Sequence, residues 1–378
     1  MHTEGAGDND GGLRISSRTT FTLLLCCASS LRAESGPTDS GWSVTIGMTL
    51  SWRSICPCPL DPNLRIPRDS SLELPLPEGE SLSLEHTLKC GQVFRWRESA
   101  SGIYRGPFRE SAVEIGLHTG RLRLRALGPS VAVGEIWRFL GLDHSVSNLT
   151  RGLDAEPWVH AAFDALPGLR IVRQDPWECV LTFLCAQWSN VRKIENSLEA
   201  LARGWGSVRV WPDGGETAVM PPPSVFAGLR QADLQPAGLG YRWRYVVQAS
   251  RQLAAGEVAL ESLRSMPYPE ALDQINRLAG VGRKVADCIL LFSLDQPGAC
   301  PVDVWVRRIF HECCDAELRA MLPDFESRRQ GELSAIEHRA ILCLAQEKWG
   351  DRAGWVQQYL FHARRLGLLQ PPGPGGPV

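Results

Sequence analysis

The chain has 378 residues, 44% of them hydrophobic, and a formal net charge of −2. This length and apolar content suffice to bury one large core or two adjoining ones. The near-neutral charge argues against general electrostatic capture of nucleic acid, because such capture needs an excess of basic residues. A local basic face is still possible, and its candidates are five pairs: Arg192/Lys193, Arg242/Arg244, Arg283/Lys284, Arg307/Arg308 and Arg364/Arg365. We expect at least two of these pairs to be ordinary solvated helix faces.

The spacing of the twelve cysteines argues against disulfides and metal sites. No Cys-x-x-Cys pair is followed by a second one. Cys56/Cys58 and Cys313/Cys314 are too close together and lack partner ligands. Four others lie in apolar helical patterns and are predicted to be buried free thiols: Cys179, Cys185, Cys288 and Cys343. The cysteines therefore predict a reducing, intracellular compartment and no bound metal.

Residues 1–62 differ in composition from the rest, being Gly/Asp-rich at first and Ser/Pro-rich later. The apolar run at residues 21–27 is too short to span a bilayer. Acidic Glu4, Asp8 and Asp10 suit neither a signal peptide nor a transit peptide. We expect a disordered extension, or a chain whose translation starts at Met48, and no membrane association.

From residue 70 to residue 127 the apolar residues alternate with polar ones, as in a half-buried strand. Short strands are predicted at residues 72–76, 93–97, 113–117 and 122–127, with glycine-containing turns between them. They predict an antiparallel sheet domain, residues 63–130, with one face buried.

Residues 131–368 show helical periodicity. The clearest start is Asp175, a capping residue followed by proline and by Glu178 of a capping box. Ser334 and Glu337 form a second box. Helices are predicted at residues 134–142, 158–166, 176–186, 194–202, from 239, 271–278, 335–348 and 355–366. Residues 187–193 are predicted as a turn, 205–223 as a Gly/Pro-rich loop and 369–378 as a disordered tail.

A helix, a Gly-Val-Gly hairpin and a second helix are predicted within residues 271–310. Gly280 and Gly282 allow positive φ and close backbone approach. The amides that open the second helix are then available to an anion such as phosphate. Lys284 and Cys288 are four residues apart in this helix and share one face.

Lys284 and Asp303 are the candidate catalytic residues. A lysine in the first helical turn is disfavoured as a cation, and a nucleophilic lysine must be neutral. Asp303 is placed to cap a helix that starts at Val304. Alone, Lys284 predicts only a surface charge and Asp303 only a cap; together, behind a Gly-Val-Gly hairpin, they point to catalysis.

This stretch resembles the helix-hairpin-helix-Gly/Pro-Asp motif of base-excision DNA glycosylases, and most closely that of eukaryote-type 8-oxoguanine DNA glycosylases. The matching segments are Gly-Val-Gly-x-Lys-Val-Ala-Asp-Cys-Ile, Pro-Val-Asp-Val and, within the predicted sheet, Gly-Gln-x-Phe-Arg-Trp. The resemblance covers about residues 70–368. It implies an α+β fold in which a TATA-binding-protein-like antiparallel sheet packs on an all-α glycosylase domain.

The resemblance also implies roles for particular residues. Lys284 would attack C1′ of the damaged nucleoside, and Asp303 would offset the positive charge that develops on the sugar. The carbonyl of Gly91 would accept a hydrogen bond from the N7–H that only the oxidised guanine carries. Cys288 and Phe361 would stack on the two faces of this base, and Gln357 would read its pairing edge.

Nine residues are expected to contact DNA: Gly280, Gly282, Val285, Tyr241, Arg242, Asn190, Lys193, Trp188 and Trp305. Tyr241 matches the wedge that fills the duplex, and Arg242 a reader of the opposite cytosine. Three positions depart from the family, which has asparagine at 188, arginine at 193 and histidine at 305. Lys193 cannot make the planar bidentate contact of arginine. We hypothesise that Trp188 stacks on the orphaned base, a contact that tolerates any sequence.

The expected partner is therefore double-stranded DNA containing oxidised guanine. We expect the protein to act as a monomer, without a cofactor and without an iron–sulfur cluster. We expect an intracellular, DNA-associated protein, in the nucleus of a eukaryote or the cytoplasm and nucleoid of a prokaryote. One alternative is a glycosylase for alkylated bases, which keeps the aspartate but lacks the lysine. Another is a non-catalytic DNA-binding module. It needs the hairpin and the basic pairs but does not need all of these residues together: Lys284, Asp303, Cys288, Gln357 and Phe361.

Overall fold

The computed structural model describes residues 32–38, 41–47, 61, 63–66, 71–153, 156–323 and 325–369. The chain divides into two compact units, residues 1–57 and 58–378. In the first unit, the backbones of β1 (Arg32–Thr38) and β2 (Gly41–Gly47) pair as an antiparallel hairpin. Most residues of the expected N-terminal extension and C-terminal tail, Met48 among them, lie outside the described residues.

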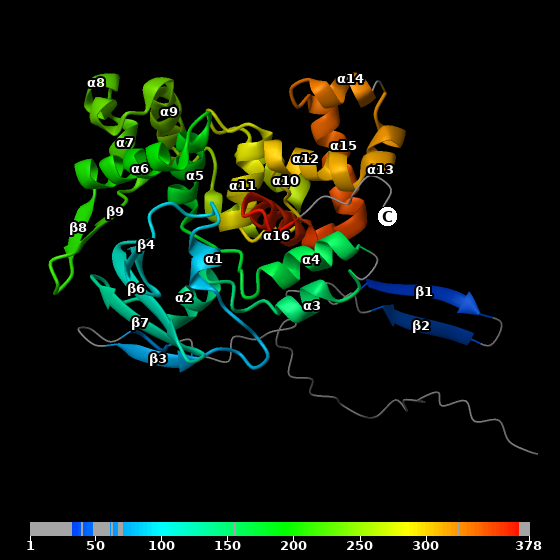
Figure 1. Cartoon of the computed structure of the whole chain (residues 1–378), viewed down its shortest axis with the longest axis horizontal. Helices are drawn as coiled ribbons and strands as arrows, with labels where there is room; N and C mark the ends of the chain where they lie inside the picture. Colours follow the sequence, from blue (N-terminus) through cyan, green and yellow to red (C-terminus); the bar gives the residue numbers. More distant parts are fainter. Residues whose placement is uncertain are drawn as a thin grey trace, which may run out of the picture. The chain divides into compact units, whose positions relative to one another are not determined.

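In the second unit, five antiparallel strands form one sheet in the order β3-β7-β6-β5-β4 (Figure 1). The strands are β3 (Leu72–Pro75), β4 (Arg97–Ala100), β5 (Ile103–Phe108), β6 (Ser111–His118) and β7 (Arg121–Leu127). α1 (Leu84–Leu88) and α2 (Val133–Phe139) share one apolar core with this sheet. The predicted α+β class is confirmed.

The sheet differs from the prediction in one respect. Successive residues of β6 are buried, Ala112 and Val113 both at 0% exposure, so both faces of this strand are covered. The hairpin strand β9 (Glu216–Val219) packs against β5 and β6. The prediction of one buried face was therefore wrong, because alternation reports only one layer of cover and β9 comes from far along the chain.

Residues 93–96 are not a strand, contrary to prediction. Side chains rather than a strand ladder bind this segment: Gln174 donates to the carbonyl of Gln92 at 2.8 Å, and Arg95 pairs with Glu178 at 2.9 Å. The predicted loop at residues 205–223 was also wrong. Here β8 (Ser207–Val210) pairs with β9 through a tight turn in which Gly214 has a φ of 84°.

The remaining chain is helical and has its own large core. Its first helices are α3 (Val146–Thr150), α4 (Pro157–Ala165), α5 (Pro176–Ala186), α6 (Val191–Trp205), α7 (Pro223–Ala227), α8 (Gln231–Leu234) and α9 (Trp243–Ala254). Short 3₁₀ turns lie at η2 (Gln235–Ala237), η3 (Gly240–Arg242), η4 (Leu260–Arg264) and η5 (Gly350–Arg352). The later helices are α10 (Tyr268–Ile275), α11 (Arg283–Ser293), α12 (Val304–Cys313), α13 (Asp315–Met321), α14 (Phe325–Gln330), α15 (Ala335–Trp349) and α16 (Ala353–Arg365).

Capping residues start these helices where the sequence predicts. Asp175 accepts from the amide of Glu178, and Ser334 accepts from the amide of Glu337. The two glutamates do not close their boxes but form ion pairs, Glu178 with Arg95 and Glu337 with Arg307. Of the four cysteines predicted to be buried, Cys343 is exposed, because it lies on the solvent side of α15.

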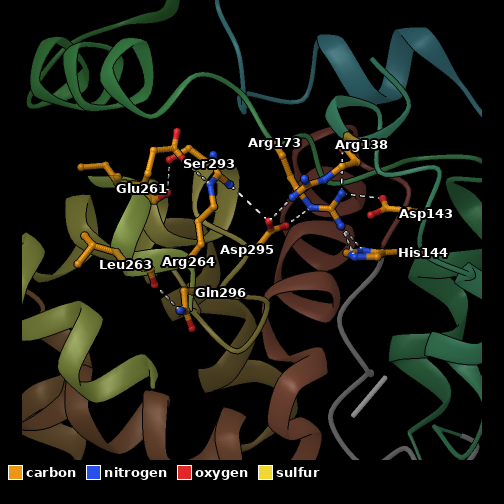
Figure 2. A network of polar contacts seen from close by, with 11 residues as sticks. Arg138, Asp143, His144, Arg173, Glu261, Leu263, Arg264, Ser293, Asp295 and Gln296 are labelled. Carbon is orange, nitrogen blue, oxygen red and sulfur yellow. Dashed lines mark hydrogen bonds and ion pairs between the residues drawn. The ribbon is translucent and has the colours of Figure 1, made fainter. Parts of the chain in front are cut away.

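An ion-pair network fastens the end of α11 to the sheet side of the molecule (Figure 2). Asp295, just after α11, pairs with Arg138 of α2 at 3.1 Å and with Arg264 at 3.4 Å. It also pairs with Arg173, which binds Asp143 at 2.6 Å. Asp295 adopts a φ of 55°, a conformation that aspartate tolerates better than most residues. No helix in the described part of the chain has the length and apolarity to cross a bilayer.

Candidate active site and nucleic-acid interface

The hairpin between α10 and α11 depends on Gly280. Its φ is +80°, and a Cβ there would collide with the ring of Tyr245. Gly282 instead has a φ of −92°, so the expectation that both glycines use positive φ holds for Gly280 alone. Within the described residues, no side chain caps the start of α11. Its first amides can therefore bind an anion.

Lys284 lies in the first turn of α11 beside Cys288. Burial raises the pKa of the Cys288 thiol to about 11, whereas the charge of Lys284 and its hydrogen bond to the thiol lower it. The Lys284 ammonium also lies 5.5 Å from the centre of the Phe183 ring. The amine is thus half-buried between a neutral thiol and an aromatic ring.

Asp303 caps α12, as predicted. Its Oδ1 accepts hydrogen bonds from the amides of Trp305 and Val306, both at 2.9 Å. Burial is the main cause of the raised pKa of the Cys288 thiol, and the negative charge of Asp303 acts on the thiol in the same direction. The carboxylate is therefore within electrostatic reach of the Lys284–Cys288 pair.

Gly91 brings the segment before β4 against α16. A Cβ on Gly91 would lie 3.9 Å from the ring of Phe361 and 3.4 Å from the guanidinium of Arg365. Gly91 itself has a φ of +92°, which a side chain would strain. Next to it, the carbonyl of Cys90 accepts a hydrogen bond from Gln358 at 3.4 Å. Gly91 and Phe361, 270 positions apart in sequence, thus meet in space.

Gln357 lies one turn before Phe361 on α16 and is buried. In the described part of the chain its Oε1 has no hydrogen-bond partner. α16 packs on α11 where Gly354 contacts Leu291. Gly354 lies one turn before Gln357, and Leu291 lies one turn after Cys288. A buried acceptor without a partner is costly, so its retention favours a ligand that donates to it.

The residues assigned to the opposite strand are arranged differently from expectation. Arg242 is buried and donates to the main-chain carbonyls of Gln187 and Trp188. Asn190 caps α6 through the amide of Lys193 at 2.9 Å. Trp188, in contrast, is 91% exposed.

The other DNA candidates range from exposed to buried. Tyr241 and Lys193 are exposed, Trp305 is half-buried beside Arg308, and Val285 is buried, so only its amide can serve DNA. In three basic pairs one arginine forms an internal ion pair: Arg283 with Asp287, Arg307 with Glu337 and Arg364 with Glu312. These pairs are therefore not simply solvated faces. The exposed cations of the five pairs are Arg192, Lys193, Arg244, Arg283, Arg308 and Arg365.

Asp287 is a residue that sequence reasoning missed. It is fully buried on α11, accepts from the Tyr268 hydroxyl at 2.5 Å, and lies 3.5 Å from the Arg283 guanidinium. Burial raises the pKa of Asp287 to about 6, although the Tyr268 hydroxyl and Arg283 lower it. The available signal was an acid among the apolar residues of Val-Ala-Asp-Cys-Ile. Among the described residues, no cluster of three His, Cys, Asp or Glu side chains is arranged to hold a metal ion.

Comparison with known proteins bears on this arrangement. Residues 73–180 match the family model described as the N-terminal domain of 8-oxoguanine DNA glycosylase. A probable N-glycosylase/DNA lyase of Methanothermobacter thermautotrophicus is 31% identical over 78% of this chain and 97% of its own. The N-glycosylase/DNA lyase OGG1 of Arabidopsis thaliana is 31% identical over 75% of this chain and 77% of its own.

A solved structure has a similar fold. The 8-oxoguanine glycosylase/lyase of Clostridium acetobutylicum, bound to double-stranded DNA with cytosine opposite 8-oxoguanine, superposes with a TM-score of 0.69. It is 25% identical, and the match covers 82% of this chain and all of that one. The chain belongs to the 8-oxoguanine DNA glycosylase family of N-glycosylase/DNA lyases.

Proposed function

We propose that this protein excises 8-oxoguanine from double-stranded DNA in base excision repair and then cleaves the strand, with Lys284 as nucleophile. The observation that carries this assignment is the half-buried amine of Lys284 beside the neutral thiol of Cys288, with Asp303 in electrostatic reach. A base stacked in duplex DNA is out of reach, so the lesion must first be flipped out.

The lysine content of the chain supports this choice of nucleophile. There are four lysines, at positions 89, 193, 284 and 348. Lys89 pairs with Glu98 at 2.7 Å, and Lys348 pairs with Glu156 at 2.8 Å. Such pairs raise the pKa of each amine and keep it protonated. Lys193 is exposed to solvent. Among the described residues, Lys284 is thus the lysine that is partly desolvated and forms no ion pair with a carboxylate.

The reaction then proceeds in two steps. The neutral amine of Lys284 forms a bond to C1′ while the glycosidic bond breaks and its electron pair leaves with the base. Asp303 stabilises the positive charge on the sugar in this step. Opening of the sugar yields a Schiff base, and loss of a C2′ proton then expels the 3′ phosphate by β-elimination.

Recognition of the oxidised base is assigned to residues from the sheet side and from α16. The Gly91 carbonyl accepts from N7–H, which unmodified guanine lacks, while Cys288 and Phe361 cover the two faces of the ring. Gln357 meets the pairing edge, and its Oε1, which has no partner among the described residues, supports this role. A site built around a donor on the substrate discriminates strongly against the analogue that lacks it. Formamidopyrimidine lesions that present a similar donor fall within the same proposal.

Phosphates are assigned to the hairpin amides at Gly280, Gly282 and Val285, with Trp305 at the start of α12 nearby in sequence. The protein would act wherever the DNA of its cell lies, in the nucleus of a eukaryote or in the cytoplasm and nucleoid of a prokaryote.

The experiment is borohydride trapping on duplexes that carry 8-oxoguanine, 3-methyladenine or unmodified guanine. We expect release of 8-oxoguanine and a covalent protein–DNA adduct, both lost in Lys284→Gln, while the control Lys89→Gln, at an exposed ion pair, still traps. Release of the base without any trapped adduct would contradict the lyase assignment. Preferential release of 3-methyladenine would favour the alkylated-base alternative.

A further inference from the structure

The turn between α5 and α6 exposes Trp188 in an unusual way. The side chain is 91% exposed, and the residue has a φ of 47°. A positive φ is unfavourable for a bulky residue, and such strain persists only where the surroundings enforce it. Neither burial nor backbone preference accounts for a tryptophan at this position.

Arg242 is what enforces the turn. The guanidinium is buried, and its Nε donates to the carbonyl of Gln187 at 2.7 Å while Nη2 donates to that of Trp188 at 2.8 Å. Nη1 donates to the carbonyl of Leu239 at 3.3 Å. All three nitrogens are thus engaged by main-chain carbonyls, two of them in the turn that carries Trp188.

The same arginine supports a second exposed aromatic residue. Its guanidinium lies 4.8 Å from the ring centre of Tyr241, which is 49% exposed. Tyr241 meets Tyr245 edge to face at 6.0 Å, and Tyr245 packs against Gly280 of the hairpin. Gln187 also donates to the Gly280 carbonyl at 3.0 Å. Two outward aromatic rings are therefore fixed to the hairpin that precedes Lys284.

We infer that Trp188 stacks on the base left unpaired opposite the flipped lesion, and that Arg242 positions Trp188 instead of reading that base. This inference rests on the proposed function. Every base offers a π face, so stacking recognises an orphaned base without selecting its identity. The nearby Asn190 holds its oxygen on the Lys193 amide, and Arg242 holds its donors on carbonyls. Opposite-strand recognition in this protein is thus tolerant, with Tyr241 as the neighbouring wedge.

The test measures binding of the full-length protein to duplexes with a tetrahydrofuran abasic analogue at the lesion position. The opposite position carries cytosine, adenine, guanine, thymine or a second tetrahydrofuran. We expect affinities within about 3-fold across the four bases and about 10-fold weaker binding when the opposite base is absent, from the usual worth of stacking. Trp188→Ala should lose this factor on all four bases and bind the baseless duplex like the wild type.

Two results would overturn the inference: cytosine bound more than ~10-fold better than the other bases, or Trp188→Ala weakening binding equally with and without an opposite base. Trp188→Phe keeps a ring and should retain most of the effect. Ile336→Ala, at a 56% exposed position on α15, is the surface control and should change nothing.

The variant Arg242→Lys distinguishes two roles of Arg242: positioning Trp188 and reading the opposite base. A positioning role predicts equal weakening on all four bases, and a combined loss with Trp188→Ala that is smaller than the product of the two separate losses. Weakening confined to cytosine would show a base reader. Tetrahydrofuran duplexes contain no base to excise, so these outcomes do not depend on the chemistry. Failure to excise 8-oxoguanine would contradict the proposed function instead.

Discussion

At the scale of single residues, the site combines groups that serve the fold with groups that the fold leaves unsatisfied. Asp303 caps α12, and its negative charge also raises the pKa of the buried Cys288 thiol. Gln357 is buried with its Oε1 unpartnered in the described part of the chain. Asp287 is a carboxyl buried beside the Lys284 turn. Each of these features has a consequence that can be measured.

Gln357→Met should separate stability from activity. The substitution removes a buried acceptor and keeps the side-chain volume, so the free energy of unfolding should rise by about 1 kcal/mol. Loss of a hydrogen bond to the base should lower the single-turnover excision rate by roughly 10–100-fold. Thermal melting and rapid-quench kinetics measure the two effects. A fall in stability would mean that Gln357 is satisfied within the protein.

Asp287 should make stability depend on pH. Its folded-state pKa, about 6, is above the ordinary 3.8, so the folded protein holds this proton more tightly than the unfolded chain. The free energy of unfolding should therefore fall as pH rises from about 4 to 6, by roughly 3 kcal/mol at most. Asp287→Asn, which can still accept from Tyr268, should abolish this dependence and be at least as stable at pH 7. A wild-type-minus-variant difference that is constant across this pH window, in denaturant melts, would contradict the assignment.

At the scale of elements, local chemistry was predictable and tertiary contact was not. Asp175, Ser334 and Asp303 were identified as caps because their hydrogen bonds lie within three residues of each cap. The β8–β9 hairpin was missed because a Gly/Pro-rich composition hid its short alternation. Arg242 was expected to face DNA, and only the folded chain shows that the carbonyls of a turn 54 positions away engage it.

The hairpin glycines offer a matched pair of substitutions. Gly280→Ala places a Cβ against Tyr245 at a φ of +80°, so unfolding should become easier by about 2 kcal/mol or more. Gly282 has an ordinary φ, and in the described part of the chain no atom lies within 4 Å of the Cβ that Gly282→Ala adds. Its cost to stability should stay within about 1 kcal/mol. Urea melts of both variants measure this, and equal destabilisation would refute the roles assigned to the two glycines.

At the scale of the whole molecule, the described part of residues 58–378 holds a sheet core and a helical core, and Gly91, before β4, approaches Phe361 of α16. The α+β class and the family could be predicted from the sequence because each motif is a short continuous segment of the chain. The boundary between the sheet domain and the helical domain, placed between residues 130 and 131, stays a prediction. The side chains of α2, which follows this boundary, belong to the sheet core. The Asp295 network, which joins α2 to the end of α11, had no local signal because its members come from four separate segments (Figure 2).

Asp295→Ala should weaken this connection. Arg173, whose side chain is 6% exposed, would keep only Asp143 as an acidic partner in the network. The loss should be roughly 2–3 kcal/mol, less than for a fully buried pair that loses its sole partner. Asp213→Ala, which removes a 58% exposed partner of Arg105, is the control and should cost less than Asp295→Ala. Equal effects in chemical denaturation would show that the network contributes no more than a surface pair.

The central claim is that one lysine of four forms the covalent intermediate. Peptide mapping by mass spectrometry, after borohydride reduction of the wild-type protein on 8-oxoguanine duplex, tests it directly. The account predicts a modified peptide carrying the reduced sugar adduct on Lys284. An adduct on Lys89, Lys193, Lys348 or the N-terminal amine would contradict it.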